Sequence, residues 1–204
     1  MPWSLRGLFA LALGLLALLG LWRVLPVARA NRVETWPGGV VTYYDATGMT
    51  RTVERAAGQW NSSGAQVSLR RVDSRSAADV VVTVDDHRLL GLCGKECLGY
   101  SSNIGRAPSG HGEVLLASDL GPHARPLSVW VAAHELGHVL GLRHQRGHAC
   151  SVMSEHAFDT RCAPSLESSE PTPAELTCVP APRDVRVAAR LYGGAPRYDD
   201  PRCR

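Results

Sequence analysis

The alternation of apolar and polar residues along the chain predicts four strands. Residues 40–45 (VVTYYD) are mostly β-branched or aromatic, which favours a strand. Residues 66–72 (QVSLRRV) alternate apolar and polar, as a strand with one solvated face does. Residues 78–84 (ADVVVTV) form a nearly continuous apolar run, which is typical of a central strand buried on both faces. The short apolar run at residues 113–117 (EVLLA) predicts a further strand.

Three other segments follow the period of an amphipathic helix. The first is residues 50–61, the second opens at Pro126, and the third is residues 184–193, with Asp184 as its cap and Gly193 as its stop. The apolar positions at helical spacing are Val53, Ala56, Ala57 and Trp60; Leu127, Val131, Leu136, Val139 and Leu140; and Val185, Val187 or Ala188, and Leu191. We interpret Trp60 as a core residue. Strand, helix, strand, strand is the opening order of a mixed α/β sheet.

Polar and glycine-rich residues separate the elements in the middle of the chain. Asp85, Asp86 and His87 follow the central strand, and we interpret them as a solvated turn. The alternative is a metal site for calcium or for a zinc ion in addition to the one discussed below. Residues 91–112 are rich in glycine and serine and predict a loop close to the functional cleft. The sequence leaves the need for Ca²⁺ open.

The N-terminal residues have the pattern of a secretory signal peptide. Arg6 precedes an apolar run at residues 7–22, and residues 28–30 (Ala-Arg-Ala) form a small-x-small cleavage site. We therefore expect cleavage near Ala30, a secreted product, and a single domain over residues 31–204. The alternative is a membrane anchor through residues 7–22, although a spanning helix needs roughly 20 apolar residues.

The charge balance gives no indication of a nucleic-acid partner. The chain of 204 residues has 22 basic and 19 acidic residues, and a formal net charge of +3. Three of the basic residues and none of the acidic ones lie in residues 1–30, so the remainder is formally neutral. We expect no nucleic-acid binding, no stable membrane association after cleavage of the leader, and a monomer.

All six cysteines follow the leader, and an even number in an exported chain predicts disulfide bonds. Several pairings are possible, and we favour the set that is local in sequence. The favoured pairs are Cys93 with Cys97, Cys150 with Cys162, and Cys178 with Cys203. The alternative for the first pair is a second zinc site that includes His87, which an oxidising compartment disfavours.

The stretch with the clearest chemical signal is residues 134–144, HELGHVLGLRH. On a helix, residues four apart share a face, so His134 and His138 can direct their imidazoles at one point, with Glu135 beside them. Gly141 stands where a left-handed glycine commonly ends a helix, and a sharp turn there can return His144 to the same point. Three histidine ligands leave the fourth position of a zinc ion open, which distinguishes a catalytic site from a structural one.

This string resembles the zinc signature of the metzincin metallopeptidases. Their second mark is a methionine in a tight turn beneath the metal, and Met153 stands nine residues after His144. The resemblance is to a matrixin-like, small secreted form. Two positions differ from related groups: Gln145 follows the third histidine where matrixins have serine, and Glu155 stands where astacins and serralysins have a zinc-binding tyrosine.

The resemblance implies an α+β fold with a mixed, mostly parallel, twisted sheet, an active-site helix and a C-terminal helix. It also implies one catalytic Zn²⁺ and hydrolysis of peptide bonds in proteins or peptides, with Glu135 as the general base. In metzincins the substrate lies antiparallel to a sheet edge, which we predict at the strand before the active-site helix. The predicted edge residues are Glu113, Val114, Leu115, Leu116 and Ala117, with an ordinary inner strand as the alternative. A secreted zinc-binding module without catalysis is the alternative.

Overall fold

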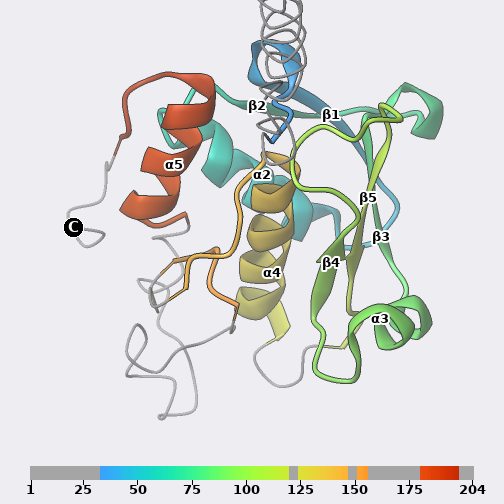
Figure 1. Ribbon diagram of the computed structural model, residues 1–204. Coiled ribbons are helices and arrows are strands. Elements are labelled where there is room, and N and C mark those ends of the chain that lie inside the picture. Colours follow the sequence, from blue (N-terminus) through green and yellow to red (C-terminus); the bar gives the residue numbers. More distant parts are fainter. Residues whose placement is uncertain (1–32, 120–123, 147–150, 156–179, 198–204) are drawn as a thin grey trace, which may run out of the picture. The chain divides into compact units, whose positions relative to one another are not determined.

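A five-stranded sheet forms the frame of the chain (Figure 1). The computed structural model describes residues 33–119, 124–146, 151–155 and 180–197, all within the unit Val33–Arg204, with backbone alone at 124–127. In spatial order the strands are β2 (Ser68–Arg71), β1 (Val40–Asp45), β3 (Val80–Val84), β5 (Gly112–Leu116) and β4 (Gly99–Ser101). The first four pair in parallel, and β4 pairs antiparallel with β5. The predicted fold class, a mixed and mostly parallel sheet, is confirmed.

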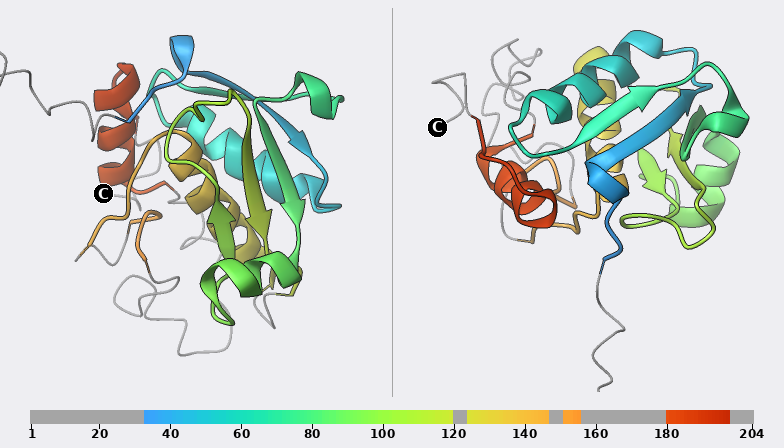
Figure 2. Two further views of the ribbon diagram at one scale, coloured as in Figure 1. Left: turned by 45° about the vertical axis from the view of Figure 1, so that its right-hand side comes forward. Right: turned by 90° about the horizontal axis from the view of Figure 1, so that it is seen from above.

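Two long helices, α2 (Thr50–Ser62) and α4 (Ala124–Val139), pack together against one face of the sheet (Figure 2). The helix α5 (Pro182–Tyr192) closes the described chain, and the short helix α3 (Asp86–Cys93) links β3 to β4. Two 3-10 turns, η1 (Pro37–Gly39) and η2 (Arg75–Ala77), precede β1 and β3. The four strands and three helices expected from periodicity are therefore present. Within the described residues, no helix is long and apolar enough to cross a bilayer.

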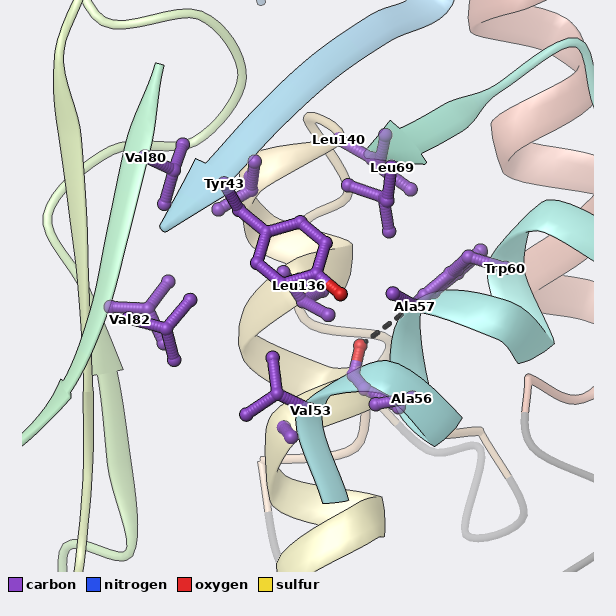
Figure 3. Close-up of a cluster of buried hydrophobic side chains, with 14 of the residues drawn as sticks. Tyr43, Val53, Ala56, Ala57, Trp60, Leu69, Val80, Val82, Leu136 and Leu140 are labelled. Atoms are coloured by element: carbon purple, nitrogen blue, oxygen red, sulfur yellow. Dashed lines mark hydrogen bonds between the residues drawn. The ribbon is translucent and has the colours of Figure 1, made fainter. Parts of the chain in front are cut away.

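The apolar stripe of α2 meets the sheet and α4 in one core (Figure 3). Val53, Ala56 and Trp60 are fully buried, as are Val41 of β1 and Leu140 just after α4. The Trp60 indole nitrogen donates a 2.9 Å hydrogen bond to the carbonyl of Ala133, so the polar end of the ring is satisfied inside the core. Trp60 is thus a core residue, as predicted, and it joins α2 to the active-site helix.

The segment predicted as a turn and a loop after β3 contains two more elements. Asp85 caps α3, because its side chain accepts a 2.9 Å hydrogen bond from the Arg88 amide. The predicted turn at residues 85–87 is therefore the start of a helix, although Asp86 and His87 are exposed to solvent, as predicted. Strand β4 follows α3, and the predicted disulfide between Cys93 and Cys97 joins the last residue of α3 to the chain two residues before β4. The other two predicted pairs include residues outside the described ranges.

The last helix begins slightly earlier than expected. Its N-cap is Ala181 rather than Asp184, because Pro182 can occupy the first turn of a helix. Asp184 is buried one turn inside, where its carboxylate accepts a 3.1 Å hydrogen bond from the Ala181 amide. Gly193 ends the helix with a positive φ of 83°, as predicted.

Candidate active site

The structure brings the three predicted histidines together at the C-terminal half of α4. His134 and His138 lie one turn apart on the buried face of the helix. The chain then turns at Gly141, whose φ is +92°, a conformation that glycine adopts without strain. The turn returns His144, whose Nε2 lies 3.2 Å from Nε2 of His134 and 3.1 Å from Nε2 of His138.

This geometry fits a zinc ion. Ligand nitrogens about 2.0–2.1 Å from a tetrahedral zinc are roughly 3.3 Å apart, close to the two separations between the imidazoles. The ligand atoms of all three residues lie within 4.8 Å of one another, and no other such group occurs among the described residues. Three neutral nitrogens are a common donor set for catalytic zinc.

Backbone carbonyls set the orientation of the two buried rings. Nδ1 of His134 lies 2.6 Å from the carbonyl of Val152, and Nδ1 of His138 lies 2.8 Å from the carbonyl of Leu142. A carbonyl can only accept, so each Nδ1 carries the proton and each Nε2 presents its lone pair to the centre. Burial lowers the pKa of His134 to about 3 and that of His138 to about 4, which keeps both rings neutral and ready to bind a metal.

The third ring is held differently. His144 is exposed, and its Nδ1 lies 3.6 Å from a carboxylate oxygen of Glu155, which also accepts a 3.2 Å hydrogen bond from Arg146. Glu155 is the residue that stands where some related peptidases have a tyrosine. In this chain Glu155 therefore lies near Nδ1 of His144, whereas Nε2 of the same ring faces the other two histidines.

A tight turn at residues 151–154 lies under the site. Met153 is fully buried, and Val152 supplies the carbonyl that orients His134. The turn is itself fixed by Asp184 of α5, which accepts hydrogen bonds from the Ser151 hydroxyl and from the Val152 amide, the latter at 2.8 Å. Burial raises the pKa of Asp184, and these hydrogen bonds oppose that shift. This role of Asp184 has no local signal, because it depends on contacts 32 and 33 residues apart.

Glu135 lies beside the histidines at the floor of the cleft. Its side chain is only 5% exposed, and burial raises its pKa to about 8. A raised pKa near the working pH suits a group that must both take up and give back a proton. A dication held by the three imidazoles would favour the ionised form of this carboxyl.

An open cleft of about 720 Å³ gives access to these residues. Its walls come from α4, from strand β4 and the residues before it, and from residues 143–146 and 154–155. Trp130 is part of the wall and stacks on His134, with ring centres 5.2 Å apart. The spacing of four residues between Trp130 and His134 was a signal in the sequence that could have indicated this contact.

The sheet edge that borders the cleft differs from the predicted one. Strand β5 pairs with β3 on one side and with β4 on the other, so Glu113, Val114, Leu115 and Leu116 lie on an inner strand, and Ala117 donates to the carbonyl of Leu98. The prediction that residues 113–117 form the edge is wrong, because the three-residue strand β4 covers it. Leu98, Gly99, Tyr100 and Ser101 line the cleft instead.

Comparisons with known proteins agree with the histidine site. The family described as metallopeptidase family M12B, reprolysin-like, matches residues 38–145, more than half of the chain, including all three histidines and Glu135. No curated protein matches the chain. Two solved structures of myroilysin are similar, one with a TM-score of 0.40 and 18% identity, the other with 0.43 and 14%. The alignments cover 66% of this chain and 62% of the first, and 80% of this chain and 92% of the second.

Proposed function

Because the chain belongs to the reprolysin-like metallopeptidases of family M12B, we propose that it is a zinc-dependent endopeptidase acting on proteins or peptides. The observation that carries the proposal is the convergence of three Nε2 atoms, two pairs of them 3.1 and 3.2 Å apart, next to a buried carboxyl in an open cleft. One Zn²⁺ per chain would be held by His134, His138 and His144.

The residues of the site have separate roles in amide hydrolysis. A zinc ion bound there supplies a Lewis acid for the attacking water and the scissile carbonyl. The Glu135 carboxylate takes a proton from the water and passes it to the departing amine, so that the leaving group departs neutral. The Val152 and Leu142 carbonyls keep the ligand rings in one orientation throughout.

The substrate would bind as an extended strand. Among the described residues, strand β4 is the last strand of the sheet and pairs with a neighbour on one side only, and its residues line the cleft. An extended peptide can add to such an edge through main-chain hydrogen bonds, with the scissile bond beside Glu135. The peptide-binding edge that we propose is therefore residues 98–101.

The compartment and the subgroup are part of the same proposal. The apolar run at residues 7–22, the small-x-small site before residue 31 and the disulfide between Cys93 and Cys97 support export to an oxidising compartment. The zinc motif and Met153 are marks of the metzincins in general, and the family match favours a reprolysin-like member over the matrixin-like form expected from the sequence. We propose a secreted monomer without a nucleic-acid partner.

The test is hydrolysis of an unfolded protein by the mature chain, with and without a chelator, alongside metal analysis. We expect zinc-dependent cleavage, loss of at least about 100-fold in Glu135→Gln because general-base catalysis is removed, and unchanged zinc content. Glu54→Gln is the control, because Glu54 is an exposed partner of Arg71 on α2. Full activity of Glu135→Gln would remove Glu135 from the mechanism, and zinc binding without any cleavage by the wild type would favour the non-catalytic module.

A further inference from the structure

Strand β4 approaches the Glu135 side chain at a residue without a side chain of its own. A Cβ atom built on Gly99 would lie 2.7 Å from Oε1 and 2.9 Å from Cγ of Glu135, and 2.8 Å from Cγ1 of Val131. All three separations are shorter than a carbon atom tolerates from a non-bonded neighbour. The space over Gly99 is therefore filled by the carboxyl group that the proposed mechanism uses.

The strand has little freedom to withdraw from that contact. Gly99 pairs with Leu116 across the antiparallel ladder, and the Ala117 amide donates a 2.9 Å hydrogen bond to the carbonyl of Leu98. The disulfide from Cys93 to Cys97 ties the chain down two residues earlier. A side chain added at Gly99 would therefore move Glu135 more readily than it would move β4.

No hydrogen bond from a described residue holds the Glu135 carboxylate, although the side chain is 5% exposed. The neighbouring ligand rings have carbonyl partners, whereas this group packs against Gly99, at whose position a Cβ atom would come within 2.9 Å of it. Its direction is thus set by the shape of its surroundings.

We propose that Gly99 is a positioning residue for Glu135: its lack of a side chain leaves the space from which the carboxylate faces the three histidines. This inference rests on the proposed function and extends it, since it ties the peptide-binding edge to the general base. A shift of about 1 Å in a catalytic group can lower the rate about 100-fold. The edge strand would therefore control the turnover number as well as peptide docking.

The kinetic test compares Gly99→Ala and Gly99→Val with Gly91→Ala and Gly91→Val. Gly91 lies on α3, two residues before the cleft-lining Cys93, and a Cβ atom there meets no atom within 4 Å. We expect kcat to fall about tenfold for Gly99→Ala and about 100-fold for Gly99→Val, with zinc content unchanged, a change in KM much smaller than the change in kcat, and little effect of either change at Gly91. A higher KM at unchanged kcat, or no change at all, would overturn the inference.

A second measurement does not depend on activity. Thermal unfolding of Gly99→Ala is compared in the wild type and in Glu135→Ala, which removes two of the three close contacts. We expect Gly99→Ala to lower Tm clearly in the wild type and much less in Glu135→Ala, because the space is then open. Equal losses in both backgrounds would refute the contact. If the wild type shows no zinc-dependent cleavage while this coupling is present, the proposed function fails and the packing of Gly99 on Glu135 stands.

Discussion

At the scale of single residues, the active-site helix contains a second glycine that the surrounding atoms require. A Cβ atom on Gly137 would overlap the sulfur of Met153 and lie 3.1 Å from Cζ2 of Trp60. Gly137 therefore lets the buried methionine approach the helix between the two histidine ligands. The contact places Met153 directly against the backbone that carries the ligands, which gives the methionine a packing role in the site.

We predict that Gly137→Ala destabilises the protein by about 1–3 kcal/mol, because overpacking in the core outweighs the better helix propensity of alanine. The matched control is Gly58→Ala on α2, where a Cβ atom meets no atom within 4 Å and we expect a gain of about 0.5–1 kcal/mol. Urea unfolding of both variants measures the difference. Equal effects of the two substitutions would show that Met153 can move aside.

The zinc ligands could be predicted from the sequence because their spacing is local. His134 and His138 need only one turn of helix between them, and Gly141 signals the turn that brings back His144. Asp184 and Gly99 could not be predicted in this way. Their contacts with the Met153 turn and with Glu135 join segments more than 30 residues apart, which no short motif encodes.

At the scale of elements, α5 acts on the site through the turn at residues 151–154. Asp184 binds the Ser151 hydroxyl and the Val152 amide, and the Val152 carbonyl orients His134. The helix α5 therefore helps to orient the ligand His134 indirectly, through Val152. It does so although none of its residues lines the cleft.

We predict that Asp184→Ala lowers zinc affinity about 10- to 100-fold, the usual effect of losing a group that orients a ligand. It also leaves the Val152 and Ala181 amides without their acceptor in the core, at a cost of about 1–3 kcal/mol. Zinc titration with a competing chelator measures the affinity, and Arg190→Ala on the exposed side of the same helix is the control. An unchanged affinity in Asp184→Ala would mean that the turn keeps its shape without α5.

The elements themselves were predictable where the pattern is long enough. Residues 40–45 and 50–61 match β1 and all but the last residue of α2, because β-branched runs and an apolar stripe are strong signals. Strand β4 has three residues, Gly-Tyr-Ser, which is too short for an alternating pattern. Its existence depends on pairing with β5. The edge predicted at residues 113–117 is therefore one strand away from the actual edge at β4.

At the scale of the whole molecule, the buried ligands make the stability of the metal-free protein sensitive to acid. The folded-state pKa values of His134 and His138, about 3 and about 4, lie below the ordinary value of 6.5. The folded state therefore binds protons less readily than the unfolded state, and this contribution to stability is present above pH 6.5 and is lost as the pH falls towards 4.

We predict that metal-free wild-type protein loses on the order of 5 kcal/mol between pH 6.5 and 4 from these two groups. In the double variant His134→Gln, His138→Gln this part of the loss should be absent, because glutamine does not titrate. Denaturant unfolding across that range measures both proteins. Parallel curves for the two proteins would contradict the burial of the imidazoles.

The arrangement of the molecule places two functions on neighbouring elements. The helix α4 carries two of the three histidine ligands and the proposed base, and the antiparallel strand β4 beside it is the proposed edge for an extended peptide. The sheet, α2 and the turn supported by α5 hold these two elements in place. This division explains why most of the buried side chains serve packing and only a few face the cleft.

The most direct test of this account is peptide hydrolysis by metal-free protein as zinc is added in measured equivalents. The account predicts no cleavage without zinc, a rise that ends at one equivalent per chain, and no rise in His138→Gln. Cleavage that is independent of zinc, or a protein that binds one zinc ion through these histidines and never cleaves, would contradict it.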